Sequence, residues 1–112
     1  MLTDHQDVLA QLQAWRRDFH RYPETAWCEY RTTSLIAKAL AELGYQITLG
    51  DGILSQASIM GRQVDIEREV ARAIEQGGDR QWLDNMTLPG LIAELDTGRP
   101  GPCLALRVDL DA

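Results

Sequence analysis

Three charged residues at alternate positions near the end of the chain are the first candidates for chemistry. Arg107, Asp109 and Asp111 directly follow the apolar run 103–106. Alternate side chains of a strand share one face, so two carboxylates would lie together with a guanidinium that offsets their charge. Carboxylates bind metal ions or orient a metal-binding histidine, and sites in α/β sheets gather at the carboxyl ends of strands. The pattern predicts a site here, and the alternative is a charged strand edge exposed to water.

A second candidate is the segment 20–24, which combines a titratable ring, a guanidinium and a carboxylate around a proline. Its members of interest are His20, Arg21, Pro23 and Glu24. The alternative is structural: a helix ends here, His20 interacts favourably with the helix dipole, and Glu24 pairs with a nearby arginine. The residues alone favour this structural interpretation.

Familiar catalytic motifs are absent from the sequence. There is no phosphate-binding loop, dinucleotide-binding glycine pattern, nucleophile elbow or HExxH zinc motif. His5 and His20 have no partner at ligand spacing, and Cys28 and Cys103 form no CxxC pair, which predicts reduced structural thiols. These histidines and cysteines therefore predict no zinc site, metal knuckle or redox motif.

Two long helices are expected on either side of the segment 20–24. Apolar residues recur at helical spacing over residues 4–20, after a capping box formed by Thr3 and Gln6. A second apolar stripe predicts a helix over 29–43, which Gly44 would end in a left-handed conformation.

Strands and a long insert follow. Residues 45–49 alternate between apolar and polar, which predicts a strand with one buried face. The insert at 50–89 contains a glycine-rich loop, a helix over 66–77 and a short helical turn at 81–85.

The last elements expected are two strands that form a hairpin. They are predicted over 91–95 and 103–110, joined by the turn-rich segment 96–102. The continuous apolar run 103–106 is typical of a strand buried on both faces, at the centre of a larger sheet. The fold class predicted is α/β: two long helices, then a mixed sheet with a terminal hairpin and a helical insert.

Composition excludes some classes of function. The 112 residues carry a formal charge of −6, which argues against nucleic-acid binding. No window is apolar enough for a membrane span or a signal peptide, so we expect no membrane partner and a cytoplasmic location.

Two separated blocks of the sequence resemble the opening of the M20 metal-dependent amidohydrolases. The first block comprises residues 15–24, 29–33 and 43–45, and the second comprises residues 95–102 and 105–112. Both match in order and spacing. The long insert at 50–89 is similar to that of the aminobenzoyl-glutamate hydrolase subfamily, in its A subunits.

This resemblance implies that residues 1–112 are the N-terminal segment, about the first quarter, of a metallopeptidase-like catalytic domain. The family cleaves amide bonds with a pair of divalent metal ions, zinc or manganese, and a glutamate general base. Its ligands come from a Cys-Gly-His run, a Glu-Glu pair and further histidines, none of which occurs here. The segment alone is therefore expected to bind no metal and to be inactive. Arg107, Asp109 and Asp111 are expected beside the metal centre, and the motif at 20–24 has an unknown role.

The implied substrate is p-aminobenzoyl-glutamate or a similar small N-acyl amino acid, and the implied partner is a related B subunit or a second copy. One alternative is a general N-acyl amino acid amidohydrolase or peptidase of the same family. Another is a non-catalytic truncated product that self-associates through sheet edges.

Overall fold

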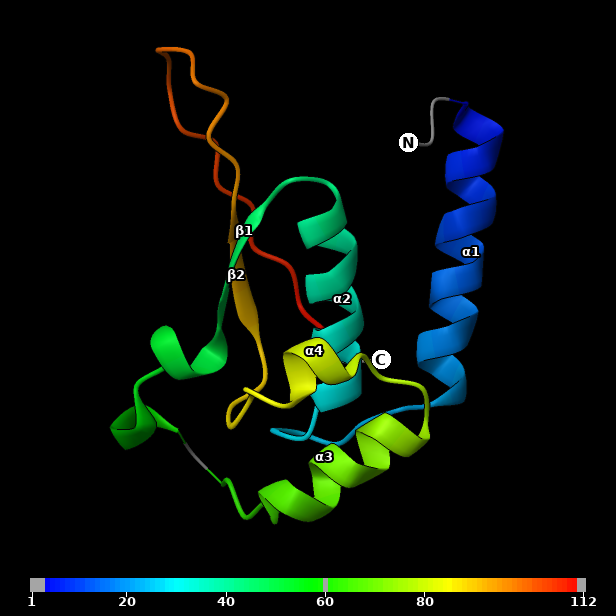
Figure 1. Ribbon diagram of the computed structural model, residues 1–112, viewed down its shortest axis with the longest axis vertical. Helices are drawn as coiled ribbons and strands as arrows, with labels where there is room; N and C mark the ends of the chain where they lie inside the picture. The colour runs from blue at the N-terminus through cyan, green and yellow to red at the C-terminus, as the bar shows by residue number, and fades with distance from the viewer. Residues whose placement is uncertain (1–3, 60, 111–112) are drawn as a thin grey trace.

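Helix α1, His5–Arg21, begins at Asp4, whose side chain accepts a hydrogen bond from the backbone N–H of Gln6 at 3.1 Å. The computed structural model describes residues 4–59 and 61–110. The predicted helix over 4–20 is confirmed, whereas the predicted cap Thr3 lies outside the described residues. α1 has no buried residue and stands to one side of the remaining elements (Figure 1). No helix in the described part of the chain is long and apolar enough to cross a membrane.

Helix α2, Tyr30–Glu42, ends as predicted, because Gly44 adopts a left-handed φ of 94°. Its most buried part is not the predicted apolar stripe but the polar first turn, where Thr33 and Ser34 are fully buried. The stripe is only half-buried, and its last member, Leu43, is 55% exposed. α2 therefore meets the rest of the fold through its first half.

The sheet has two antiparallel strands, β1, Gln46–Leu49, and β2, Leu91–Glu94. Gln46 lies opposite Glu94, and Leu49 lies opposite Leu91. Along β1 the odd-numbered side chains are half-buried and the even-numbered ones exposed, as the alternation predicts. Two short 3-10 turns follow β1: η1, Gly50–Gly52, and η2, Gln56–Ser58.

The predicted terminal hairpin and mixed sheet are wrong. The chain does reverse direction after β2 (Figure 1), but the partner of β2 is β1, and residues 103–110 form no strand in the described structure. These residues are exposed rather than buried on both faces; Leu104 is 85% exposed. The physical reason is that a strand buried on both faces needs a layer above and below it, and no described helix packs there.

The insert supplies most of the core. It contains α3, Ile66–Glu75, and α4, Arg80–Leu83, close to the predicted bounds. The main buried cluster consists of Tyr30 from α2 and three insert residues, Ala73, Leu83 and Met86. The segment 50–89 is therefore part of the folding unit and not an appendage to it.

Gly50 lies where the insert's two ends meet, and we expect Gly50→Ala to destabilise the fold. An added Cβ would overlap the Pro89 carbonyl oxygen and lie 2.8 Å from the Leu88 carbonyl oxygen, both of them backbone atoms that cannot rotate away. Overpacking of this kind costs about 1–3 kcal/mol. The control is Gly52→Ala, whose Cβ meets only the end of the Thr48 side chain, which can rotate. Urea denaturation should give the larger loss for Gly50→Ala, and equal losses would contradict the described contact.

Candidate functional site

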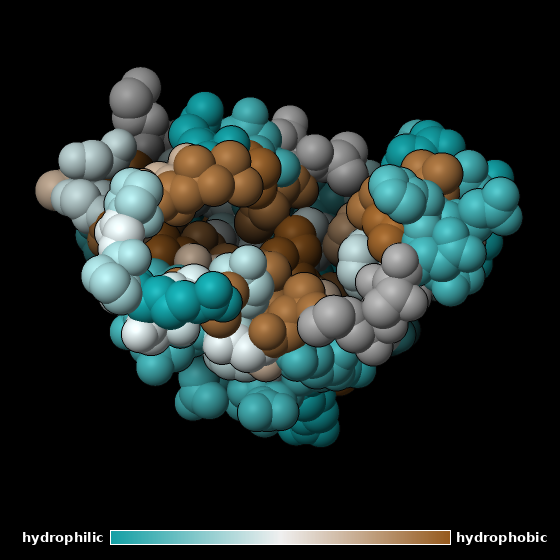
Figure 2. Space-filling model, turned by 90° about the horizontal axis from the view of Figure 1, so that it is seen from above, coloured by the Kyte–Doolittle hydropathy of each residue, from teal (hydrophilic) through white to brown (hydrophobic). Residues whose placement is uncertain are grey.

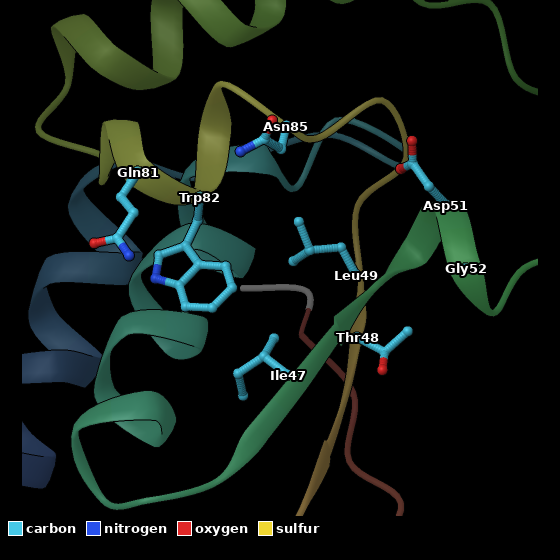
Figure 3. Close-up of a pocket in the computed structure, with 8 residues that line it drawn as sticks. All are labelled: Ile47, Thr48, Leu49, Asp51, Gly52, Gln81, Trp82 and Asn85. Atoms are coloured by element: carbon cyan, nitrogen blue, oxygen red, sulfur yellow. The ribbon is translucent and has the colours of Figure 1, made fainter.

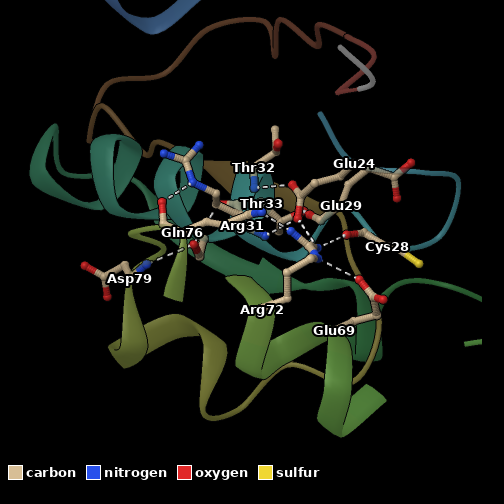
Figure 4. A network of polar contacts seen from close by, with 11 residues as sticks. Glu24, Cys28, Glu29, Arg31, Thr32, Thr33, Glu69, Arg72, Gln76 and Asp79 are labelled. Carbon is tan, nitrogen blue, oxygen red and sulfur yellow. Dashed lines mark hydrogen bonds and ion pairs between the residues drawn. The ribbon is translucent and has the colours of Figure 1, made fainter. Parts of the chain in front are cut away.

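The motif at residues 20–24 is fixed through Glu24, whose side chain is 1% exposed. Its carboxylate accepts hydrogen bonds from the backbone N–H of Arg31 at 2.8 Å and of Thr32 at 2.7 Å. Both N–H groups lie at the start of α2, where the helix itself offers no acceptor. Arg72 of α3 donates to the same carboxylate at 2.8 Å (Figure 4). The predicted pairing of Glu24 with an arginine is confirmed, and Glu24 joins the start of α2 to α3.

The other members of the motif, His20, Arg21 and Pro23, are exposed. His20 and Arg21 occupy the last turn of α1, where positive charge interacts favourably with the terminal carbonyl groups. The structure thus places one of the four motif residues in a buried network and leaves three at the surface.

Arg72 lies between two carboxylates, with Nε donating to Glu69 at 2.8 Å and Nη2 to Glu24. Burial lowers the pKa of the Arg72 guanidinium, but hydrogen bonds and charges of the two glutamates raise it by more, so the net pKa lies above its ordinary value. Nη2 also donates to the Cys28 carbonyl oxygen at 3.2 Å. Cys28 is a buried free thiol, as predicted for a structural cysteine, whereas Cys103 is exposed.

Arg31 links the end of α1 to α2 and α3. Its side chain is 4% exposed, and Nη2 lies 2.9 Å from each carboxylate oxygen of Asp18. Nε donates to the Gln76 carbonyl oxygen at 2.8 Å. The guanidinium carbon lies 4.4 Å from the centre of the Tyr22 ring, a cation–π distance. Arg31 therefore has a structural role, because its contacts join the end of α1 to α2 and α3.

The turn after the motif borders a cavity of about 280 Å³. Trp27 and Glu29 line it, and so does Leu110, from the far end of the chain. Trp27 has a φ of 65°, a left-handed conformation that is costly for a bulky side chain. The structure therefore brings the end of segment 103–110 to the turn that follows the motif, two regions that the sequence analysis singled out separately.

The predicted charged triplet lies on that same segment. Arg107 Nη2 is 3.0 Å from an Asp109 carboxylate oxygen, and the two side chains are 89% and 67% exposed. Asp111 lies outside the described residues. Alternation thus places Arg107 and Asp109 within ion-pairing distance of each other, at the surface of the described structure.

A second cavity, of about 460 Å³, lies between β1 and α4. Ile47 and Leu49 point toward the Trp82 ring, whereas Thr48 points away from it (Figure 3). Asp51 lies at the edge, but its carboxylate is already engaged. It accepts hydrogen bonds from the backbone N–H groups of residues 87 and 88, at 3.1 and 2.7 Å, and from the hydroxyl of residue 87. No local pattern in the sequence predicts this contact, because it joins residues 36 positions apart.

Asp51 should make stability depend on pH. Burial raises the pKa of its carboxyl, but hydrogen bonds from Thr87 and Leu88 lower it by more, so the folded pKa lies below the ordinary value of about 3.9. Such a group stabilises the fold above its unfolded pKa, and this contribution is lost as pH falls through the folded pKa. Asp51→Asn should therefore be less stable than the parent near pH 7, with the difference shrinking toward about pH 2.5. Urea denaturation at both pH values tests this, with the exposed Asp84→Asn as control; a constant difference would contradict it.

Neither cavity nor the charged segment is arranged as a metal centre. Within residues 4–59 and 61–110, no group of three or more His, Cys, Asp or Glu side chains is placed to hold a metal ion. The described residues therefore do not form a complete metal site.

Comparison with known proteins gives close relatives over nearly the whole chain. It is 45% identical over 106 residues to the A subunit of p-aminobenzoyl-glutamate hydrolase from Escherichia coli (strain K12), which matches 91% of this chain and 24% of that protein. It is 44% identical over 109 residues to indole-3-acetyl-aspartic acid hydrolase of Enterobacter agglomerans, covering 94% of this chain and 25% of that protein. No protein-family model matches the chain.

A comparison with solved structures supports the same relationship. The aminobenzoyl-glutamate utilization protein from Klebsiella pneumoniae superimposes with a TM-score of 0.88 at 43% identity, covering 96% of this chain and 28% of that one. The chain therefore spans about a quarter of the length of the relatives it matches.

Proposed function

Since the chain is homologous to hydrolases named for p-aminobenzoyl-glutamate and indole-3-acetyl-aspartic acid, we propose that it forms one part of an amidohydrolase of N-acyl amino acids. The favoured substrate is p-aminobenzoyl-glutamate. The observation that carries the proposal is identity of 43–45% over nearly the entire chain, together with a shared fold, in proteins named for this compound.

The complete enzyme is proposed to use a pair of zinc or manganese ions, as the resemblance to the M20 amidohydrolases implies. Among the described residues no group of three or more His, Cys, Asp or Glu side chains could hold a metal ion, so a complete ligand set is expected to include residues outside them. On its own the chain is expected to be inactive. Its contribution is to position the segment bearing Arg107 and Asp109 near the reacting centre.

A chimera tests this proposal. The matched 106 residues of the Escherichia coli relative are replaced by those of this chain, and hydrolysis of p-aminobenzoyl-glutamate is measured. We expect the chimera to retain activity. A chimera that is folded and loaded with metal but cleaves no N-acyl amino acid would overturn the proposal.

Within the chimera, Arg107→Ala and Asp109→Ala should each lower kcat by about 10–100-fold, the usual effect of losing a group that supports a metal site. The control is Arg99→Ala, an exposed arginine in the turn before the segment. If all three variants keep full activity, residues 107 and 109 have no role in the reaction.

A second candidate is a general N-acyl amino acid amidohydrolase. It is favoured by the 44% identity to a hydrolase named for a different acyl group and a different amino acid. The ratio of kcat/KM for p-aminobenzoyl-glutamate and indole-3-acetyl-aspartate in the chimera separates the two. A ratio near one supports the general enzyme.

A further inference from the structure

The cavity of about 280 Å³ beside the turn that follows the 20–24 motif is mostly apolar. Trp27, Leu54, Pro89 and Leu110 are among the residues that line it, and Glu29 is the one charged residue among the described residues that do so. An apolar cavity of about 150 Å³ is enough to bind benzene. The space therefore suits an aromatic group of one or two rings, whereas sites for whole drug-sized ligands run from about 300 to 1,000 Å³.

Trp27 is held in a backbone conformation that a bulky residue disfavours. Its φ of 65° lies in the left-handed region, which glycine adopts freely. Backbone strain of this kind concentrates at sites that bind or react. The turn is fixed on both sides, because the Cys28 N–H donates to the Thr25 carbonyl oxygen at 2.9 Å and the buried Glu24 carboxylate is bound to the start of α2. The surroundings thus keep a strained tryptophan at the wall of the cavity.

Leu110 places the cavity next to the segment that is proposed to lie near the reacting centre. It is half-buried, whereas Leu104 and Val108, earlier in the segment, are 85% and 75% exposed. Leu110 also stands between Asp109 and Asp111 in the sequence. In an N-acyl amino acid, the acyl group includes the carbonyl carbon that water attacks, so a pocket for this group must adjoin the reacting centre.

The compounds for which the two relatives are named share an aromatic acyl group. One compound joins a p-aminobenzoyl group to glutamate, and the other joins an indole-3-acetyl group to aspartate. Each amino acid half carries two carboxylates, which the Glu29 carboxylate repels, since bringing like charges together costs free energy. The aromatic half therefore suits the cavity better than the amino acid half.

We propose that this cavity binds the aromatic acyl group of the substrate, with Trp27 packing against the ring and Glu29 turning the amino acid half away. The inference rests on the proposed amidohydrolase function and adds to it the class of acyl group. Contact between two aromatic rings is worth more than the apolar area that it buries. Aromatic acyl groups are therefore preferred over small aliphatic ones.

Turnover by the chimera tests this preference with two substrates that share the amino acid and the amide bond, p-aminobenzoyl-glutamate and acetyl-glutamate. Trp27→Gly removes the ring at a φ that glycine adopts freely. It should lower the ratio of kcat/KM for the aromatic substrate to that for the acetyl substrate at least 10-fold, mainly by raising KM for the aromatic one. The control Thr25→Ala, at an exposed residue of the same turn that does not line the cavity, should keep the parent ratio.

Binding to the chain itself separates a failure of this inference from a failure of the proposed function. p-Aminobenzamide, a neutral compound that represents the acyl half, is titrated into the 112-residue chain while NMR follows the three indole N–H signals. The Trp27 signal should shift, and the other two should not. Trp82 lines the other cavity, and Trp15 is exposed on α1, the helix beside the apolar hollow seen in Figure 2, so both report binding to other apolar surfaces.

The two measurements distinguish the possible outcomes. If a folded, metal-loaded chimera cleaves neither substrate while the Trp27 signal shifts, the proposed function is wrong and the cavity is still an aromatic site. If the chimera is active and Trp27→Gly leaves the ratio of kcat/KM unchanged, the inference is overturned. A ligand that shifts the signal of Trp15 or Trp82 and leaves that of Trp27 unchanged overturns it as well.

Discussion

Replacing Glu24 with glutamine is expected to lower the free energy of unfolding by about 3 kcal/mol, the lower end of the cost of breaking a buried ion pair. The Glu24 side chain is almost fully buried and satisfies Arg72 together with two N–H groups at the start of α2. Glutamine keeps the size but turns an amide donor toward groups that are all donors, and it leaves Arg72 short of a counter-charge. Urea denaturation of the parent and variant chains measures the loss.

The matched control is Glu69→Gln, which removes the other carboxylate bound to Arg72 at the same 2.8 Å. Glu69 is 23% exposed and lies three positions before Arg72 on the same helix, so its loss should cost no more than about 1 kcal/mol. If the two glutamine variants lose the same stability, Glu24 does not have the joining role that its contacts indicate.

Leu83→Ala should also destabilise the chain strongly, by about 2–5 kcal/mol. Leu83 is 1% exposed and packs in the cluster with Tyr30, Ala73 and Met86. Truncation removes buried apolar surface and leaves a cavity between α4 and α2, which the short helix α4 cannot close. The control is Leu43→Ala, at a leucine that is 55% exposed. Similar losses in the two variants would show that the insert does not build the core.

Local signals were sufficient to predict the helices. The apolar periodicity and Gly44 predict α2 within a residue of its observed bounds, and β1 follows from its alternation. Such features depend on neighbours a few positions apart, so they are visible in the sequence. The same is true of the glycines that end α3.

Long-range partners were not predictable in this way. The antiparallel pairing of β1 with β2 joins residues more than 40 positions apart across the insert, and the nearby turn 96–102 pointed instead to a hairpin. Asp51 and Thr87 likewise meet only because the ends of the insert converge. Of the site, Glu24 was predicted to pair with an arginine, but no local pattern identifies Arg72 as that arginine.

The apolar pattern of residues 103–110 indicates burial on both faces, whereas the structure leaves the segment exposed. Both observations are accounted for if the pattern reflects contacts with polypeptide outside the described fold. The functional prediction for Arg107, Asp109 and Asp111 depends on those contacts as well.

The most direct test of the central claim is metal content measured together with p-aminobenzoyl-glutamate hydrolysis, on this chain alone and on the complete chimera. If the chain is one part of a metal-dependent amidohydrolase, only the chimera binds about two metal ions and cleaves the amide. If the 112-residue chain by itself binds metal and cleaves, our assignment of the metal ligands and catalytic groups to other polypeptide is wrong.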